Sequence, residues 1–76
     1  MNEMAMVEYL LRQYAEYDQK SINSQECEDS YEAIYYSAKA DLAYTIIQDR
    51  FGMTIRETDT EYIAENSVCS VRVRKE

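Results

Sequence analysis

Two clusters of carboxylates contain most of the residues whose types and spacing could support chemistry. The first comprises Glu26, Glu28, Asp29 and Glu32. Calcium binds clustered carboxylates, but its loops place Asp or Asn at alternate positions with a glycine at the bend, and this pattern is missing. We interpret the cluster as a helix cap joined to a solvated loop, and we expect no metal and no other cofactor.

The second cluster comprises Glu57, Asp59 and Glu61, with Glu65 beyond it. At a period of two, these carboxylates could line one edge of a strand or turn. Carboxylates spaced along a surface can imitate nucleic-acid phosphates, so the Arg and Lys residues of a protein that normally holds DNA or RNA would pair with them instead. Ordinary surface solvation is the alternative interpretation of this cluster.

Catalysis has little support in the sequence. The chain has no histidine to act as a general base near neutral pH, and its single glycine cannot build a phosphate-binding loop. No Ser or Cys has an evident activating base nearby. A chain of 76 residues also has little interior in which to shift carboxylate pKa values. We predict that the protein is not an enzyme.

The charge balance restricts the class of partner. Fifteen acidic residues against eight basic ones give a net charge of −7. An acidic body disfavours direct binding of nucleic-acid phosphates or anionic lipid, and it is compatible with a basic protein partner. Plain solubility explains the same charge. No apolar run reaches the ~18 residues of a membrane span. Cys27 and Cys69 are interpreted as free thiols, with one disulfide between them as the alternative, so we expect a soluble cytoplasmic protein.

The elements that must position these residues follow from the apolar periodicity. Residues 2–20 predict a helix with Asn2 as its cap, and the polar residues 21–28 predict a loop. Asp29, followed three residues later by Glu32, predicts a capping box that opens a second helix, and Gly52 closes that helix. Residues 53–58 and 68–74 alternate as strands, with a turn at Asn66–Ser67. Residues 61–65 form either a further strand or a short helical turn.

These elements predict one α+β domain over residues 1–76. Two antiparallel helices would pack on a small antiparallel sheet of two or three strands, in the order helix, helix, strands. The second helix carries two apolar stripes. The first comprises Ala33, Tyr36, Ala40, Ala43, Tyr44, Ile47 and Phe51, and the second comprises Tyr31, Tyr35, Ala38, Leu42 and Ile46. We expect one stripe to pack on the first helix and the other on the sheet.

Tyrosine is unusually frequent, with eight Tyr against one Phe and no Trp. A buried tyrosine needs a partner for its hydroxyl, so several of these rings should stay half exposed, and protein interfaces are enriched in this residue. We predict a partner-binding surface formed by Tyr31, Tyr35 and Tyr36 beside the acidic cluster at Glu26 to Glu32. The carboxylates of Glu57, Asp59 and Glu61 are predicted as a further set of contacts.

In size, charge and tyrosine content the chain resembles the small acidic inhibitors encoded by phages and mobile elements, of which the anti-CRISPR proteins are the best-known group. The resemblance covers no motif, and it implies an inhibitor that acts in the cytoplasm of the host cell. The leading hypothesis is therefore a small acidic module that binds and inhibits a basic, nucleic-acid-handling protein. The alternative is a structural homodimer or adaptor, in which the second helix pairs with its own copy.

Overall fold

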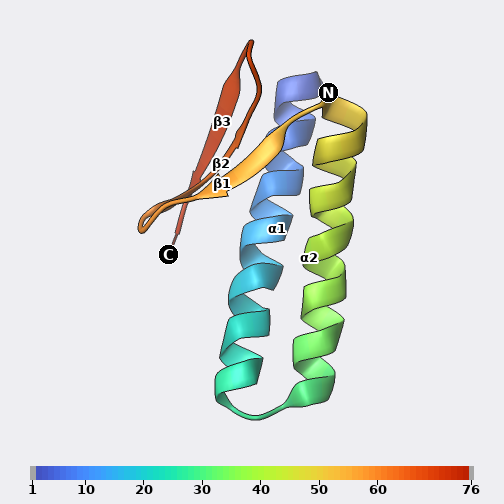
Figure 1. The fold of residues 1–76 in the computed structure, drawn as a ribbon, viewed down its shortest axis with the longest axis vertical. Coiled ribbons are helices and arrows are strands. Elements are labelled where there is room, and N and C mark those ends of the chain that lie inside the picture. The colour runs from blue at the N-terminus through green and yellow to red at the C-terminus, as the bar shows by residue number, and fades with distance from the viewer. Residues whose placement is uncertain (1, 76) are drawn as a thin grey trace.

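The computed structural model describes residues 2–75, and in this range two long helices precede three strands (Figure 1). The elements are α1 (Glu3–Glu26), α2 (Ser30–Phe51), β1 (Thr54–Glu57), β2 (Glu61–Glu65) and β3 (Ser70–Arg74). The strands form an antiparallel sheet in the order β1-β2-β3. The predicted α+β architecture is confirmed. Residues 61–65 are the central strand, and the helical turn is excluded.

The first helix is longer than predicted. Asn2 caps it as expected, since its side-chain oxygen accepts a hydrogen bond from the Ala5 amide at 2.7 Å. The predicted loop at 21–28 is wrong, because α1 continues to Glu26. Ser21 and Ser24 are buried, and the Ser21 hydroxyl donates to the Ala33 carbonyl oxygen at 3.2 Å. These serines are small contact residues between two helices, although their polarity is typical of a loop.

The turn between the helices is therefore short. The Glu28 amide donates to the Gln25 carbonyl, and the Asp29 amide donates to the Ser24 carbonyl at 2.9 Å. Glu28 adopts a left-handed conformation with φ of +59°, which is uncommon for a residue with a side chain. The backbone thus reverses within three residues and sets α2 antiparallel to α1 (Figure 1).

Both ends of α2 carry the predicted signals. Asp29 accepts a hydrogen bond from the Glu32 amide at 3.1 Å, and Gly52 ends the helix with φ of +63°. The second half of the predicted capping box is wrong. The Glu32 side chain does not return to the Asp29 amide; it accepts from the Ser24 hydroxyl at 3.4 Å, because the Asp29 amide is already bonded to the Ser24 carbonyl.

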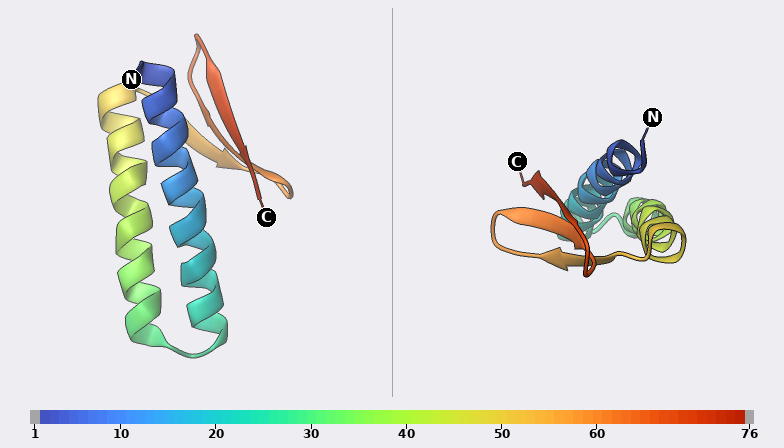
Figure 2. Two further views of the ribbon diagram at one scale, coloured as in Figure 1. Left: turned by 180° about the vertical axis from the view of Figure 1, so that it is seen from behind. Right: turned by 90° about the horizontal axis from the view of Figure 1, so that it is seen from above.

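The sheet packs mainly on α1, which corrects the expectation that the second stripe of α2 would receive it. In the view from above, the strands lie beside α1, and α2 lies on the other side of the hairpin (Figure 2). The core lies between the amino-terminal half of α1, the carboxyl-terminal end of α2 and the inner face of the sheet. Its buried members are Val7, Leu11, Ala15, Ile47, Met53, Tyr62, Ala64 and Val73. The sheet covers one half of the hairpin, and the half nearest the turn consists of two helices alone (Figure 1).

Tyr62 joins the sheet to α1. The side chain is fully buried on the inner face of β2. Its hydroxyl donates to the Asp18 carboxylate at 2.7 Å and accepts from the Gln19 amide at 2.8 Å. The ring meets Tyr14 edge to face, with 5.6 Å between centroids. Burial, followed by the hydrogen bond to Asp18, raises the pKa of the Tyr62 phenol well above its usual range.

The last strand begins two residues later than predicted. Val68 and Cys69 were expected to open it, but both of their amides donate to the Asn66 side-chain oxygen, at 2.8 and 2.9 Å. This side chain forms the predicted turn at Asn66–Ser67 and leaves Val68 exposed. Both cysteines are free, with Cys27 exposed and Cys69 half-buried.

We predict that Tyr62→Phe lowers the free energy of unfolding by about 1–2 kcal/mol, because it removes a hydroxyl that satisfies two partly buried groups. The raised phenol pKa favours the protonated form in the folded chain. Stability should therefore fall as pH rises above the usual tyrosine pKa of about 10, and less steeply in the variant. Urea titrations at pH 7 and pH 10.5 measure both effects.

Tyr9→Phe is the matched control, because Tyr9 is exposed, and it should leave the unfolding free energy within about 0.5 kcal/mol of the wild-type value. An unchanged unfolding free energy in Tyr62→Phe would show that the hydroxyl does not hold the sheet to α1.

Candidate protein-binding surface

Helix α2 has one covered face and one uncovered face. Small residues let it approach α1 closely, because Ala33, Ala40 and Ala43 are buried on the inner stripe together with Ile47. The opposite side, which we name the outer face of α2, comprises Tyr31, Ile34, Tyr35, Ala38 and Leu42. Its four large residues are exposed to 88% (Tyr31), 69% (Ile34), 55% (Tyr35) and 61% (Leu42). Four large apolar or aromatic side chains on one helix face form a patch that a small domain rarely leaves in water.

The three tyrosines predicted as contacts lie in two settings. Tyr31 and Tyr35 belong to the outer face of α2, whereas Tyr36 is half-buried and stacks on Tyr17 of α1 with 6.1 Å between centroids. Tyr35 meets Tyr36 edge to face at 5.3 Å. Tyr36 therefore belongs to the contact between α1 and α2. Its link to the outer face is its edge-to-face contact with Tyr35.

Two lysines lie over these rings. Lys20 is 5.5 Å from the centroid of Tyr36, and Lys39 is 5.3 Å from that of Tyr35. A cation over an aromatic face is attracted by the ring quadrupole, with a contribution of about 0.5–1 kcal/mol at exposed sites. Lys39 thus places a positive charge beside the outer face of an otherwise acidic chain.

The first acidic cluster lies around the turn of the hairpin, next to Tyr31. Glu26, Glu28 and Asp29 are exposed, and Asp29 is held by its capping bond to the Glu32 amide. Within residues 2–75 none of these three carboxylates, nor that of Glu32, is within ion-pair distance of a basic side chain. We name Glu26, Glu28 and Asp29 the acidic hairpin end. The structure thus places Tyr31 beside the acidic hairpin end, whereas Tyr36 packs against α1.

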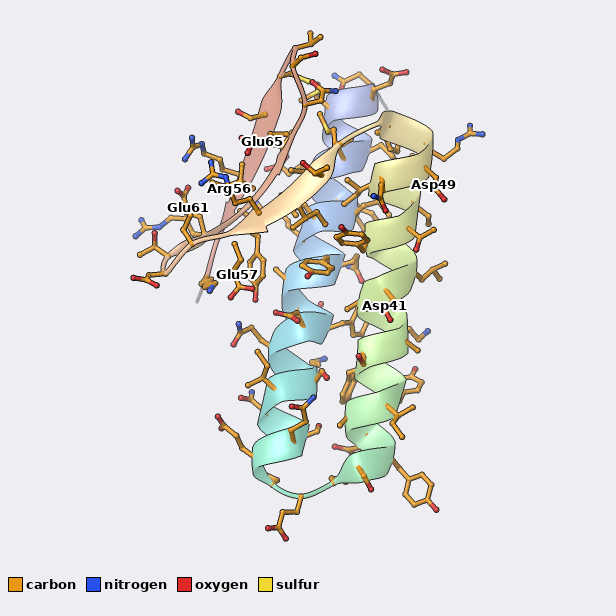
Figure 3. All side chains as sticks on the ribbon, in the orientation of Figure 1. Asp41, Asp49, Arg56, Glu57, Glu61 and Glu65 are labelled. Atoms are coloured by element: carbon orange, nitrogen blue, oxygen red, sulfur yellow. The ribbon has the colours of Figure 1, made fainter. Side chains whose placement is uncertain are left out.

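The second acidic cluster is divided between the two faces of the sheet. Glu57 lies opposite Tyr62 in the strand register and so shares the inner face, whereas Glu61, next to Tyr62 in β2, belongs to the outer face. Asp59 is exposed in the turn between them. The expectation that these residues line one edge is therefore wrong, because the turn shifts the alternation of side chains. Glu57 and Glu61 also lie well away from the turn between α1 and α2 (Figure 3).

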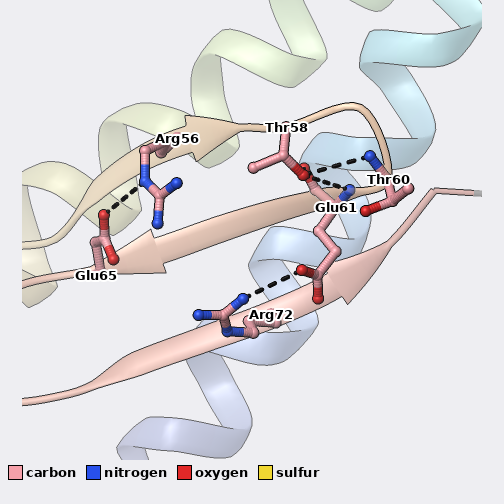
Figure 4. Close-up of polar contacts among 6 residues, drawn as sticks. All are labelled: Arg56, Thr58, Thr60, Glu61, Glu65 and Arg72. Carbon is pink, nitrogen blue, oxygen red and sulfur yellow. Dashed lines mark hydrogen bonds and ion pairs between the residues drawn. The ribbon is translucent and has the colours of Figure 1, made fainter.

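The strand carboxylates also have cations of their own. Glu57 pairs with Lys75 at 2.6 Å, Glu61 with Arg72 at 3.1 Å, and Glu65 with Arg56 at 2.9 Å. Figure 4 shows the last two pairs on the outer face of the sheet. The two arginines lie opposite Ile63, which is only 1% exposed although it points away from the helices. No helix of residues 2–75 packs on this face of the sheet, so the burial of Ile63 is attributed to the aliphatic stems of the two arginines.

Two features of this surface were missed by sequence reasoning. Ile34 lies three residues after Tyr31 on the same side of α2, and this helical spacing could have revealed it. A groove of about 610 Å³ also runs between α1 and β3, where Arg12, Lys20 and Lys75 contribute to the lining. Each of these three cations pairs with a carboxylate nearby, whereas Arg74, which also lines the groove, forms no ion pair within residues 2–75.

In the part of the chain that the structure describes, no group of three or more His, Cys, Asp or Glu side chains is arranged to hold a metal ion. Neither α1 nor α2 has an apolar window of the length that crossing a bilayer requires. Comparison of the chain with known protein families, with curated proteins and with solved structures finds no match in any of the three. The surface must therefore be interpreted from its own chemistry.

We predict that the pKa of the Glu65 carboxyl lies below its usual range, because Arg56 donates a hydrogen bond to it and adds a favourable charge. Arg56→Gln should return that pKa toward its ordinary value. The stabilisation from this pair is present at neutral pH and is lost as pH falls through the lowered pKa. Carboxyl-detected NMR titration measures the shift. Arg12→Gln, which removes a cation from α1, is the control and should leave Glu65 unchanged.

Proposed function

We propose that the chain is a small acidic protein-binding module that acts by contact and not by catalysis. One observation carries the proposal: the outer face of α2 is apolar, aromatic and uncovered, although the chain has a sheet that could have packed on it. Exposed Tyr, Leu and Ile side chains on a rigid helix are the groups that contribute most to a protein contact, because they bury large areas for little lost side-chain freedom.

The acidic hairpin end favours a basic protein as the foreign partner. None of its three carboxylates forms an ion pair with a basic side chain of residues 2–75, and the chain as a whole has a net charge of −7. Complementary potentials of this kind speed encounter and select the partner. The partner class that we propose is a nucleic-acid-handling protein, because such proteins present the required basic surface. The chain would act as its inhibitor.

Phosphate mimicry is best supported at the acidic hairpin end. At the strands, Glu57 and Glu61 are already paired with Lys75 and Arg72, so a partner would have to compete with internal cations. Of the predicted residues Glu57, Asp59 and Glu61, only Asp59 is exposed and forms no ion pair within residues 2–75. The proposal therefore gives the acidic hairpin end the larger part in binding the basic partner.

The test combines Glu26→Gln, Glu28→Gln and Asp29→Asn, which remove three charges while asparagine keeps the helix cap. Proteins captured by the immobilised wild-type chain from cells that encode it should be basic, and the variant should hold the purified protein about tenfold more weakly. Calorimetry in 50 and 300 mM salt should show wild-type binding weakening as salt rises, because exposed charges are screened.

The control combines Glu3→Gln, Asp41→Asn and Asp49→Asn, which change the net charge by the same amount at exposed positions away from the hairpin turn. It should bind nearly as well as the wild type. Equal affinity of the wild type and both variants, or binding that does not respond to salt, would count against an acidic contact at this end.

A further inference from the structure

The outer face of α2 has the spacing of a coiled-coil seam. Tyr31, Tyr35, Ala38, Leu42 and Thr45 follow one another at steps of four, three, four and three residues, which is an average period of 3.5. The buried residues Ala33, Ala40 and Ile47 occupy the opposite side of the helix, where α1 lies. A second helix can therefore lie along this seam without displacing α1 or the sheet (Figure 2).

We infer that the occupant of this seam is a second copy of the chain, with the two α2 helices antiparallel about a two-fold axis. The inference rests on the proposed function only in taking the outer face of α2 as a contact surface, and it names what covers that face. Side-chain size and charge each select this occupant and a single register.

Size complementarity selects the register in which Tyr35 of one chain lies over Ala38 of the other. The same alignment sets Tyr31 over Leu42, and the two-fold axis repeats both contacts. A large ring opposite a small residue lets two helices interdigitate, as close packing requires. Ala38 is exposed in the single chain, so the space that would accept the ring is open.

Charge complementarity selects the same register. A two-fold axis perpendicular to two antiparallel helices brings each flank of the seam against the same flank of the other helix. In this alignment Glu32 of each chain meets Lys39 of the other, which forms two symmetric ion pairs. Lys39 already lies beside the seam, over Tyr35. The opposite flank places Ile34 near Asp41, with no like-charge contact.

Sliding one helix by a heptad in either direction removes this match. One shift sets Lys39 against Lys39 and Asp41 against Asp41, and the other sets Glu32 against Glu32. Like charges facing each other along a helix pair are destabilising. In a parallel arrangement Lys39 of one helix would lie opposite Ile34 of the other, so the Glu32–Lys39 ion pair would also be absent. Only the register with Tyr35 over Ala38 joins size and charge complementarity.

The exposed side chains of the outer face supply more than half of the area that a stable dimer buries. Covering the exposed parts of Tyr31, Ile34, Tyr35 and Leu42 would bury on the order of 500 Å² per chain, and the flanking residues would add to this. A stable interface buries roughly 800 Å² per partner. Antiparallel pairing places the two acidic hairpin ends at opposite ends of the seam, so the dimer would present two binding ends for a basic partner.

Sedimentation equilibrium of the whole chain between 1 and 200 μM tests the inference. The wild type should approach twice its 9.0 kDa mass as concentration rises. Lys39→Glu should weaken the dimer by about tenfold, since it turns two attractions into repulsions. The exchange Glu32→Lys with Lys39→Glu should restore most of the affinity.

Arg50→Glu is the matched control, because it changes the net charge as Lys39→Glu does but lies beyond the overlapping residues. It should leave the dimer nearly as strong as the wild type. A monomer mass throughout the concentration range overturns the inference, and so does a dimer that responds equally to Lys39→Glu and Arg50→Glu. Binding of a basic protein by such a monomer would leave the proposed function standing, whereas a dimer that binds no basic protein would overturn that proposal and keep the inference.

Discussion

The Tyr62 hydroxyl, held between Asp18 and Gln19, is the contact on which the arrangement of the molecule depends. A small sheet could in principle lie over either helix or across the groove between them. The Tyr62 ring and its hydroxyl fix it against the middle of α1, and the ring contact with Tyr14 sets the same side. Because the sheet is committed to α1, helix α2 is left with α1 as its principal neighbour, and its other side stays in water.

Within residues 2–75, two surfaces have no further helix or sheet packed on them: the outside of the sheet and the outside of α2. The chain treats them differently. On the outside of the sheet, the arginine stems of Arg56 and Arg72 cover Ile63 and are anchored by Glu65 and Glu61. This cover is charged, internal and complete, so it needs no partner. On the outside of α2, the chain offers aromatic and aliphatic side chains with few charges, and nothing in residues 2–75 covers them. The contrast between these two surfaces is the main reason for regarding α2 as the contact element.

Much of the fold follows from local signals. Asn2, Asp29, Gly52 and Asn66 act as the caps and turn that their residue types predict, because each side chain or backbone conformation acts on amides within a few residues. The inner stripe of α2 and the first and last strands also follow from periodicity, whereas the sequence leaves residues 61–65 open between a strand and a helical turn. The extension of α1 through Ser21 and Ser24 does not, because a serine at a helix–helix contact and a serine in a loop look alike in sequence.

The placement of the candidate surface was only partly predictable. Exposure of Tyr31 and Tyr35 follows from the difficulty of burying so many hydroxyls in a small fold. The choice of helix for the sheet rests on a contact between residues 18 and 62, which no local pattern encodes. The pairing of Glu57 with Lys75 and of Glu61 with Arg72 has the same origin, since strand register and the docking of the sheet bring distant residues together. The sequence alone therefore overestimates the unpaired negative charge around Glu57 and Glu61.

The half of the hairpin that the sheet does not cover has a consequence for motion. Tyr31, Tyr35 and the acidic hairpin end lie where two helices pack through alanine and serine, with little buried apolar area on either side. Local opening costs least where few apolar contacts are broken, so amide hydrogens near the turn should exchange with solvent sooner than those beside Ile47 and Tyr62. The proposed contact surface is thus on the half of the molecule that should open more readily. Binding there would slow the fluctuation of the hairpin as well as bury its face.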